Sequence, residues 1–291
     1  MTPFTGDNRI DFATLQRLVD FLIRHGAQAI GLPMHIGESI NMSAEERRDL
    51  ARAGVEAAAG RVPVFVNVSL PGTDEVIALA RHAESVGAKG VIVISPYHWQ
   101  PARAALIEHF AVVAKSIGIS LIAYNYPERL GVTLTPDLLL ELIERCPNFV
   151  GLKDAGINME YFTEACRVTQ AAQPDFAVFT GVEYFLPGMV VGGSGAFSAC
   201  GAVAPQLTKA VYDACAQENY VRARPLQHKL SHVFNLIKVD YPAGIKAAME
   251  LMGRPAGPTR RPIPPLGADA RLRLKSELDR LGILADEPHG W

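Results

Sequence analysis

The sequence of 291 residues predicts an α/β protein, a (β/α)8 TIM barrel followed by C-terminal helices. Short β-branched apolar runs recur along the chain, and each is apolar at consecutive positions, which is typical of strands buried on both faces. Helical patterns separate these runs at roughly thirty-residue spacing, as parallel strands require. A doubly wound open sheet is the alternative. The barrel is favoured because no Rossmann glycine fingerprint opens the first helix.

Seven segments are predicted as strands, and the last of them is the weakest. They are residues 27–34, 62–69, 89–95, 119–125, 149–154, 176–181 and 195–201. A barrel of this class has eight strands. The chain opens on TPFTGDN, which has the composition of a loop that follows a strand. We therefore expect the first strand to be missing or to lie upstream of Met1.

Helix signals alternate with the strands. Residues 12–25 carry one apolar face, Ser43 and Glu46 form a capping box at the start of a helix, and residues 106–117 carry an apolar stripe. Beyond residue 203 the pattern is helical. The three segments concerned are 204–217, 220–252 and 268–283.

The C-terminal helices are interrupted by a Pro-rich stretch, residues 254–267, which we interpret as a surface connection between packed helices. We therefore divide the chain into a barrel, residues 1–203, and C-terminal helices that close and extend it, residues 204–291.

Composition excludes several classes of protein. The chain has 28 basic and 30 acidic residues and is 49% apolar, which is typical of a globular protein and not of a nucleic-acid binder. No apolar run reaches the roughly 18 residues of a membrane span, and the N-terminus lacks the pattern of a signal peptide. The four cysteines form no CxxC pair, so we expect reduced thiols in a cytoplasmic protein.

Two side chains at the ends of neighbouring strands are candidates for catalysis. Lys153 ends an apolar strand, where burial would lower its pKa and leave an amine that can form a Schiff base with a ketone or aldehyde. The alternative is a lysine paired with Asp154 at the barrel rim. Tyr124 ends the preceding strand and could transfer protons to or from such an amine, or be a packed tyrosine.

Further polar residues follow other strands. His35 and Glu38 follow the first visible strand and His98 follows the third, so they could act as acid and base or bind a metal ion. Their spacing matches no HxH or HExxH motif, which makes the metal signal weak. Arg129 could bind a carboxylate or be a solvated loop residue, and Glu183 could be a site carboxylate or a helix-cap charge.

Six short motifs together resemble a known family. TPF, GES, SPY, YNYP, GLKDA and GGSGAFS occur in the order and at the spacing of the dihydrodipicolinate synthase / N-acetylneuraminate lyase family, over nearly the whole chain. The resemblance implies a (β/α)8 barrel with a C-terminal helical extension and a homotetramer, with no metal or organic cofactor. It also implies that Lys153 forms a Schiff base with pyruvate or another 2-oxo acid and that Tyr124 relays protons.

The loop that carries GES departs from the family pattern. The family places two adjacent hydroxyl residues where this chain has His35 and Ile36, so their proton relay is absent. The resemblance implies that Gly37, Glu38 and Ser39 still shape the pocket for the substrate carboxylate.

Other positions of the family's site are partly kept. Where the synthases have a second tyrosine this chain has His98, whereas Arg129 matches the synthase arginine that binds the aldehyde's carboxylate. The resemblance also implies substrate contacts at Phe197 and Ser198 of GGSGAFS. Histidines can act as acid or base near neutral pH, which suits a hydroxylated 2-oxo acid.

These observations predict a Schiff-base-dependent lyase, an aldolase or dehydratase, that acts on pyruvate or a 2-oxo-3-deoxy acid. The alternative within the family is 4-hydroxy-tetrahydrodipicolinate synthase, which condenses pyruvate with aspartate semialdehyde. Two further classes remain: a metal-dependent barrel hydrolase that uses His35, His98 and a carboxylate, and an inactive family member that only binds a small acid.

Overall fold

The computed structural model describes residues 1–156 and 158–291, and the chain divides into two compact units. Unit 1 combines Met1–Val64 with Ser198–Trp291, and unit 2 is Phe65–Phe197.

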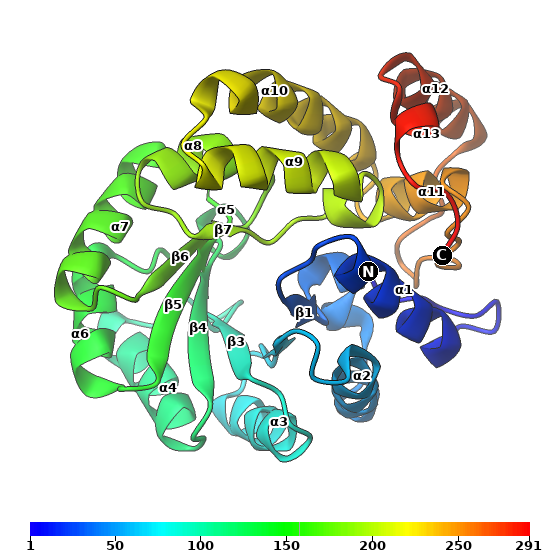
Figure 1. Cartoon of the computed structure of the whole chain (residues 1–291). Coiled ribbons are helices and arrows are strands. Elements are labelled where there is room, and N and C mark those ends of the chain that lie inside the picture. Colours follow the sequence, from blue (N-terminus) through cyan, green and yellow to red (C-terminus); the bar gives the residue numbers. More distant parts are fainter. Residues whose placement is uncertain (157) are drawn as a thin grey trace. The chain divides into compact units, whose positions relative to one another are not determined.

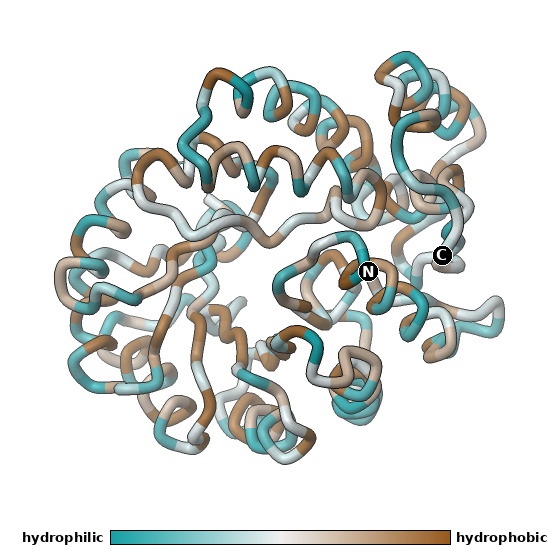
Figure 2. Tube along the Cα trace, in the orientation of Figure 1, coloured by the Kyte–Doolittle hydropathy of each residue, from teal (hydrophilic) through white to brown (hydrophobic). Residues whose placement is uncertain are grey.

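Unit 2 is built on parallel strands that pair in the order of the chain (Figure 1). The strands are β2 (Val64–Asn67), β3 (Gly90–Ile94), β4 (Ser120–Asn125), β5 (Phe149–Asp154), β6 (Ala177–Thr180) and β7 (Gly195–Ala196). Every residue of β3 is buried, and Figure 2 shows this central part of the sheet in the brown of hydrophobic residues. Burial on both faces explains why the strands are apolar at consecutive positions.

Helices follow the strands of unit 2, and those of ten or more residues cover the outer face of its sheet (Figure 1). They are α3 (Thr73–Ser85), α4 (Arg103–Lys115), α5 (Pro127–Leu130), α6 (Pro136–Arg145), α7 (Met159–Ala172) and α8 (Phe185–Val190). Neighbours along the chain pack against each other, α3 on α4, α4 on α6 and α6 on α7. This strand–helix alternation leaves the carboxyl ends of the strands at one edge of the sheet.

Unit 1 is mainly helical and is assembled from both ends of the chain. Its elements are α1 (Phe12–Arg24), β1 (Ile30–Leu32), η1 (His35–Gly37), η2 (Ser39–Asn41), α2 (Ala44–Ala58), η3 (Cys200–Ala202), α9 (Pro205–Ala216), α10 (Tyr220–Ile237), α11 (Ala243–Leu251), α12 (Ala268–Arg280) and α13 (Ile283–Asp286). Here α1 packs on α2, α9 on α10, and α11 on α12. None of the helices described in either unit is long and apolar enough to cross a membrane.

The predicted strands and the predicted capping box are confirmed at their predicted positions. Each of the seven strands forms inside its predicted segment, although the weakest, 195–201, retains only Gly195–Ala196. The capping box is present, with the backbone N–H of Glu46 donating to Ser43 Oγ and that of Ser43 donating to Glu46 Oε2. The opening segment is a loop closed by an isolated bridge between Phe4 and Ile10.

The structure differs from the sequence pattern at one helix. The segment 220–252 is two helices, α10 and α11, separated by a turn that ends at Pro242. Proline disfavours helical backbone in the residue before it, which accounts for the break. The division of the chain into residues 1–203 and 204–291 stays a prediction.

Candidate active site

The pairing of β4 with β5 places Lys153 and Tyr124 side by side. The two residues are direct partners in the parallel register, so their side chains leave the same face of the sheet. Lys153 Nζ lies 3.9 Å from the centre of the Tyr124 ring and 5.0 Å from the centre of the Phe197 ring. The amine thus lies close to two aromatic rings.

The amine of Lys153 is removed from water. Its side chain is 4% exposed, and burial lowers its pKa to about 7, because desolvation disfavours the charged form. The negative charge of Glu183 opposes this shift. A large fraction of the amine is therefore neutral near pH 7, which is the nucleophilic form.

Tyr124 has the opposite property and holds its proton firmly. Burial raises the pKa of its phenol far above the usual value, and the nearby Tyr126 and Asp154 add to this effect. The Tyr124 and Tyr126 rings are stacked, with centres 5.8 Å apart. Tyr124 therefore presents a neutral hydroxyl, which can both donate and accept a hydrogen bond.

Glu183 follows β6 and is 1% exposed. The turn that carries it is fixed by Thr180, whose hydroxyl donates to the carbonyl of Val182 at 2.9 Å. Because its charge acts on Lys153, Glu183 is the carboxylate that favours the protonated amine.

Asp154, by contrast, is turned away from Lys153. Successive residues of a strand point to opposite faces, and the Asp154 carboxylate accepts hydrogen bonds from Asn125 and from the backbone of Gly156. The pairing of Lys153 with Asp154, considered as an alternative from the sequence, is therefore not what the structure has.

Two other predicted residues of unit 2 lie exposed beyond strand ends. His98 follows β3 in left-handed backbone, φ 80°, and its ring meets that of Trp99 edge-on with centres 5.0 Å apart. Arg129 lies on the short helix α5, directly after β4. Phe197 is held by its backbone N–H, which donates to the carbonyl of Thr180 at 2.9 Å.

In unit 1 the predicted loop residues form two short helical turns around Glu38. His35–Gly37 and Ser39–Asn41 flank it, and Glu38 itself has left-handed backbone, φ 60°. Its carboxylate is buried, 2.9 Å from Lys246 Nζ, and it accepts the backbone N–H of Arg260 at 2.7 Å. Glu38 thus holds the loop, while His35 and Ile36 are partly exposed.

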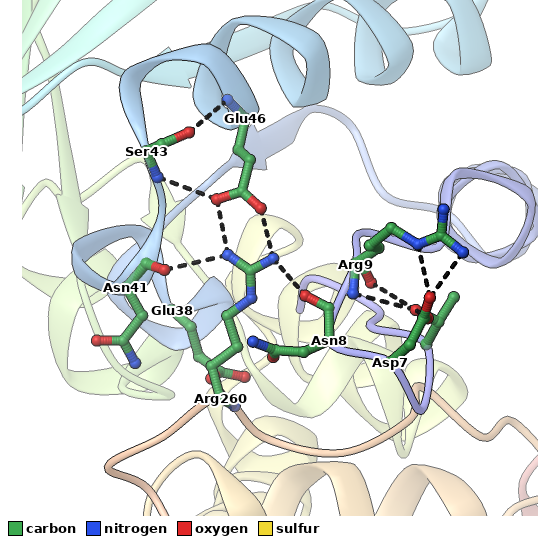
Figure 3. A network of polar contacts seen from close by, with 9 residues as sticks. Asp7, Asn8, Arg9, Glu38, Asn41, Ser43, Glu46 and Arg260 are labelled. Carbon is green, nitrogen blue, oxygen red and sulfur yellow. Dashed lines mark hydrogen bonds and ion pairs between the residues drawn. The ribbon is translucent and has the colours of Figure 1, made fainter.

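The end of this loop is held by the guanidinium of Arg260 (Figure 3). It donates to both carboxylate oxygens of Glu46 and to the backbone carbonyls of Asn41 and Asn8. Glu46 therefore joins the capping box of α2 to the Pro-rich connection, and this holds the two segments of unit 1 together.

Ser198 has a local role in the same unit, where its hydroxyl accepts the backbone N–H of Gly201 at 3.2 Å. Within residues 1–156 and 158–291 no group of three or more His, Cys, Asp or Glu is arranged to hold a metal ion.

Sequence reasoning missed the partners that surround these residues. Asn125 and Lys246 are buried polar residues with partners distant in the chain, 29 positions away for Asn125. The sequence does show that Asn125 is a polar residue in an apolar strand, and such a residue needs a buried hydrogen-bond partner. The sequence does not show which residue that partner is.

Comparisons with known proteins agree on one family. The Dihydrodipicolinate synthetase family matches residues 1–281. A 4-hydroxy-tetrahydrodipicolinate synthase of Methanosphaerula palustris is 35% identical over 282 residues, which cover 96% of this chain and 96% of the relative. YagE, a putative 2-dehydro-3-deoxy-D-gluconate aldolase of Escherichia coli, is 31% identical over 286 residues, 97% of this chain and 95% of the relative.

Solved structures agree with the sequence comparisons. The crystal structure of YagE in complex with pyruvate matches with a TM-score of 0.93 at 31% identity and covers 97% of this chain and 96% of that chain. Dihydrodipicolinate synthase from Aquifex aeolicus matches with a TM-score of 0.93 at 28% identity, covering 99% and 97%. The predicted (β/α)8 TIM barrel with C-terminal helices is thereby confirmed.

Proposed function

Because the chain belongs to the Dihydrodipicolinate synthetase family over residues 1–281, we propose that Lys153 is its Schiff-base lysine and that its substrate is pyruvate or a 2-oxo-3-deoxy acid. The chain is a lyase of this family. One observation carries the proposal: the Lys153 amine is buried, has a pKa near 7 and lies 3.9 Å from the Tyr124 ring.

The chemistry follows from a neutral amine in a dry site. Lys153 Nζ attacks the C2 carbonyl carbon of the 2-oxo acid, and the carbinolamine takes up a proton and loses water to leave a protonated imine. The C4 hydroxyl then gives up its proton while the imine accepts the electron pair of the C3–C4 bond, which releases an aldehyde and leaves an enamine. Protonation at C3 and hydrolysis then return pyruvate and the free amine. In a dehydratase, C3 instead loses a proton and the C4 hydroxyl leaves as water.

Each step moves a proton, and Tyr124 is the proposed relay. Its hydroxyl is neutral and its ring lies against the lysine amine, so it can pass a proton between the carbinolamine oxygen and the substrate. Glu183 is proposed to balance the charge of the protonated imine, because its charge acts on Lys153. Phe197 is proposed to limit the space around the adduct, because its ring lies near the amine.

We favour cleavage or dehydration of a hydroxylated 2-oxo acid, the substrate class in the names of YagE and of a probable 2-dehydro-3-deoxy-D-pentonate aldolase of Escherichia coli. His35 and His98 replace hydroxyl residues of the synthases and are proposed as acid/base groups or substrate contacts. Gly37 and Ser39, with Ile36 and Ser198, are proposed to line the carboxylate pocket.

The synthase reaction remains the second candidate because the family resemblance implies that Arg129 binds the aldehyde's carboxylate. We expect His35→Thr to lower cleavage of a 2-oxo-3-deoxy acid at least tenfold, the effect of losing an acid/base group. Aldehyde release and condensation of pyruvate with aspartate semialdehyde are measured for both proteins. Condensation by the unmodified protein at a rate above cleavage would reverse the order of the two candidates.

The decisive experiment is reductive trapping of the adduct. The protein is incubated with pyruvate and reduced with borohydride, and its intact mass is measured, with Lys153→Ala alongside. We expect one pyruvyl adduct on the unmodified protein and none on Lys153→Ala. In the same assay we expect Tyr124→Phe to slow trapping by about 10²–10⁴-fold, the range for a positioned proton-transfer group.

Each outcome of this experiment has a definite meaning. An adduct on another lysine would remove Lys153 from the mechanism, and a slowing below about threefold would remove Tyr124 from the relay. A thermal shift with pyruvate but neither adduct nor turnover would identify an inactive family member that only binds a small acid.

A further inference from the structure

A buried polar pair lies next to the Lys153–Tyr124 pair along the two strands, on the opposite face of the sheet. Asn125 and Asp154 are the next partners in the register of β4 and β5, one residue beyond Tyr124 and Lys153. Because side chains alternate along a strand, they leave the sheet on the face opposite the amine and the phenol. Each is 1% exposed, and Asn125 Nδ2 donates to Asp154 Oδ1 at 2.7 Å.

The pair is also tied to the segments that surround it. Asn125 Oδ1 accepts the backbone N–H of Leu134 at 3.0 Å, and Asp154 Oδ1 accepts that of Gly156 at 3.3 Å. The carbonyl of Leu134 in turn accepts the hydroxyl of Tyr161, on α7, at 2.6 Å. Two strand ends, the loop before α6 and the helix α7 therefore meet at this one pair.

The carboxylate of Asp154 affects the phenol of Tyr124 on the other face of the sheet. Burial raises the pKa of Asp154 to about 6, while the hydrogen bonds from Asn125 and Gly156 oppose that shift. Asp154 is thus mostly ionised at neutral pH, and its negative charge is one of the causes that raise the pKa of Tyr124. The charge helps to keep the proton on the phenol.

Stability alone does not explain such a pair. Both faces of a parallel sheet are normally filled by apolar side chains, and replacing two hydrogen-bonded partners by apolar groups of similar shape can be nearly neutral for stability. A polar pair gives a fixed hydrogen-bond geometry in place of adaptable packing. It fixes the separation of the two strands at the level of the reacting groups.

We propose that Asn125 and Asp154 are positioning residues that set the separation of the Lys153 amine from the Tyr124 phenol. This inference rests on the proposed Schiff-base function of that pair. Misplacement of a reacting group by about 1 Å can lower a rate about 100-fold, so the pair contributes to rate without touching the substrate.

The test compares an apolar pair, Asn125→Leu/Asp154→Leu, with the exchanged pair, Asn125→Asp/Asp154→Asn. The rate constant for borohydride trapping is measured as a function of pyruvate concentration, and thermal unfolding is measured for each variant. We expect the apolar pair to slow trapping at saturating pyruvate by about 10–100-fold. We expect the exchanged pair, which can rebuild the hydrogen bond, to stay within about threefold of the unmodified protein.

Asn148→Ala is the matched control. Asn148 Nδ2 donates to the carbonyls of Ala114, Ile117 and Ile119, so it fixes the opposite, amino-terminal ends of the same two strands. We expect it to lower the unfolding temperature and leave the trapping rate within about threefold, because it is remote from the reacting groups.

Unchanged trapping in the apolar pair would overturn the inference, and so would slow trapping in an exchanged pair that melts like the unmodified protein. If the unmodified protein forms no adduct, the proposed function fails. The inference is then decided by a crystal structure of the apolar pair: we expect the distance from Lys153 Nζ to the Tyr124 ring centre to depart from 3.9 Å by about 1 Å. An unchanged distance would overturn it.

Discussion

The proposed chemistry depends on one lysine, because that lysine lies near the end of a buried strand. Lys153 lies one residue before the end of β5 and is buried, so its amine is desolvated and its pKa lies near 7. The negative charge of Glu183 opposes this lowering of the pKa, so the pKa of the amine stays near 7 and does not fall further. The site thus holds a nucleophile that titrates in the range where a metabolic enzyme works.

This titration predicts the pH dependence of adduct formation. Only the neutral amine attacks a carbonyl, so the initial trapping rate should rise about tenfold per pH unit below pH 7 and level off above it. Trapping is followed at fixed pyruvate from pH 5 to pH 9, roughly two units on either side of that pKa. A profile that keeps rising beyond pH 9, as for an exposed lysine, would contradict the desolvated site.

At the scale of elements, the loop η1–η2 depends on a side chain from the far end of the chain. Glu38 has left-handed backbone, which is unfavourable for a residue with a side chain, and the buried ion pair with Lys246 stabilises it there. Lys246 also donates to the carbonyl of Pro258 at 2.6 Å. The conformation of the loop therefore depends on a residue of α11 as well as on the loop's own residues.

Removing the cation of this buried ion pair should lower the stability of the protein. We expect Lys246→Met to lower the free energy of unfolding by roughly 3–5 kcal/mol, because it leaves the Glu38 carboxylate buried without its partner. Denaturant unfolding measures the change. The control is Lys229→Met, whose pair with Asp286 is largely exposed and should change stability by less than about 1 kcal/mol.

The double variant Glu38→Gln/Lys246→Met tests whether the loss of stability comes from the unpaired charge. Since it removes both charges together, we expect it to be more stable than Lys246→Met alone. Equal instability of the two variants would mean that the unpaired Glu38 charge is not the cause of the loss of stability.

For the whole molecule, we propose a homotetramer in the cytoplasm, as the family resemblance implies. Sedimentation velocity should give a species of four 31.5 kDa chains. A single sedimenting species of one chain at micromolar concentration would contradict the tetramer.

The sequence by itself determined the elements and the family. Consecutive apolar residues located all seven strands, and the capping box located the start of α2, because burial on two faces and satisfied backbone donors are local properties of the sequence. Six motifs in register, two of which contain Tyr124 and Lys153, also sufficed to identify the family. Local pattern was enough for these conclusions.

Only the tertiary structure decided which side chains meet. The sequence left Lys153 between a Schiff-base role and a pair with Asp154, and the alternation of β5 turned Asp154 to Asn125 on the other face. Glu38 appeared as a site residue, yet its carboxylate is held by Lys246 and Arg260, more than 200 positions away in the chain. Such contacts depend on register and packing across the fold, and no local pattern of residues encodes them.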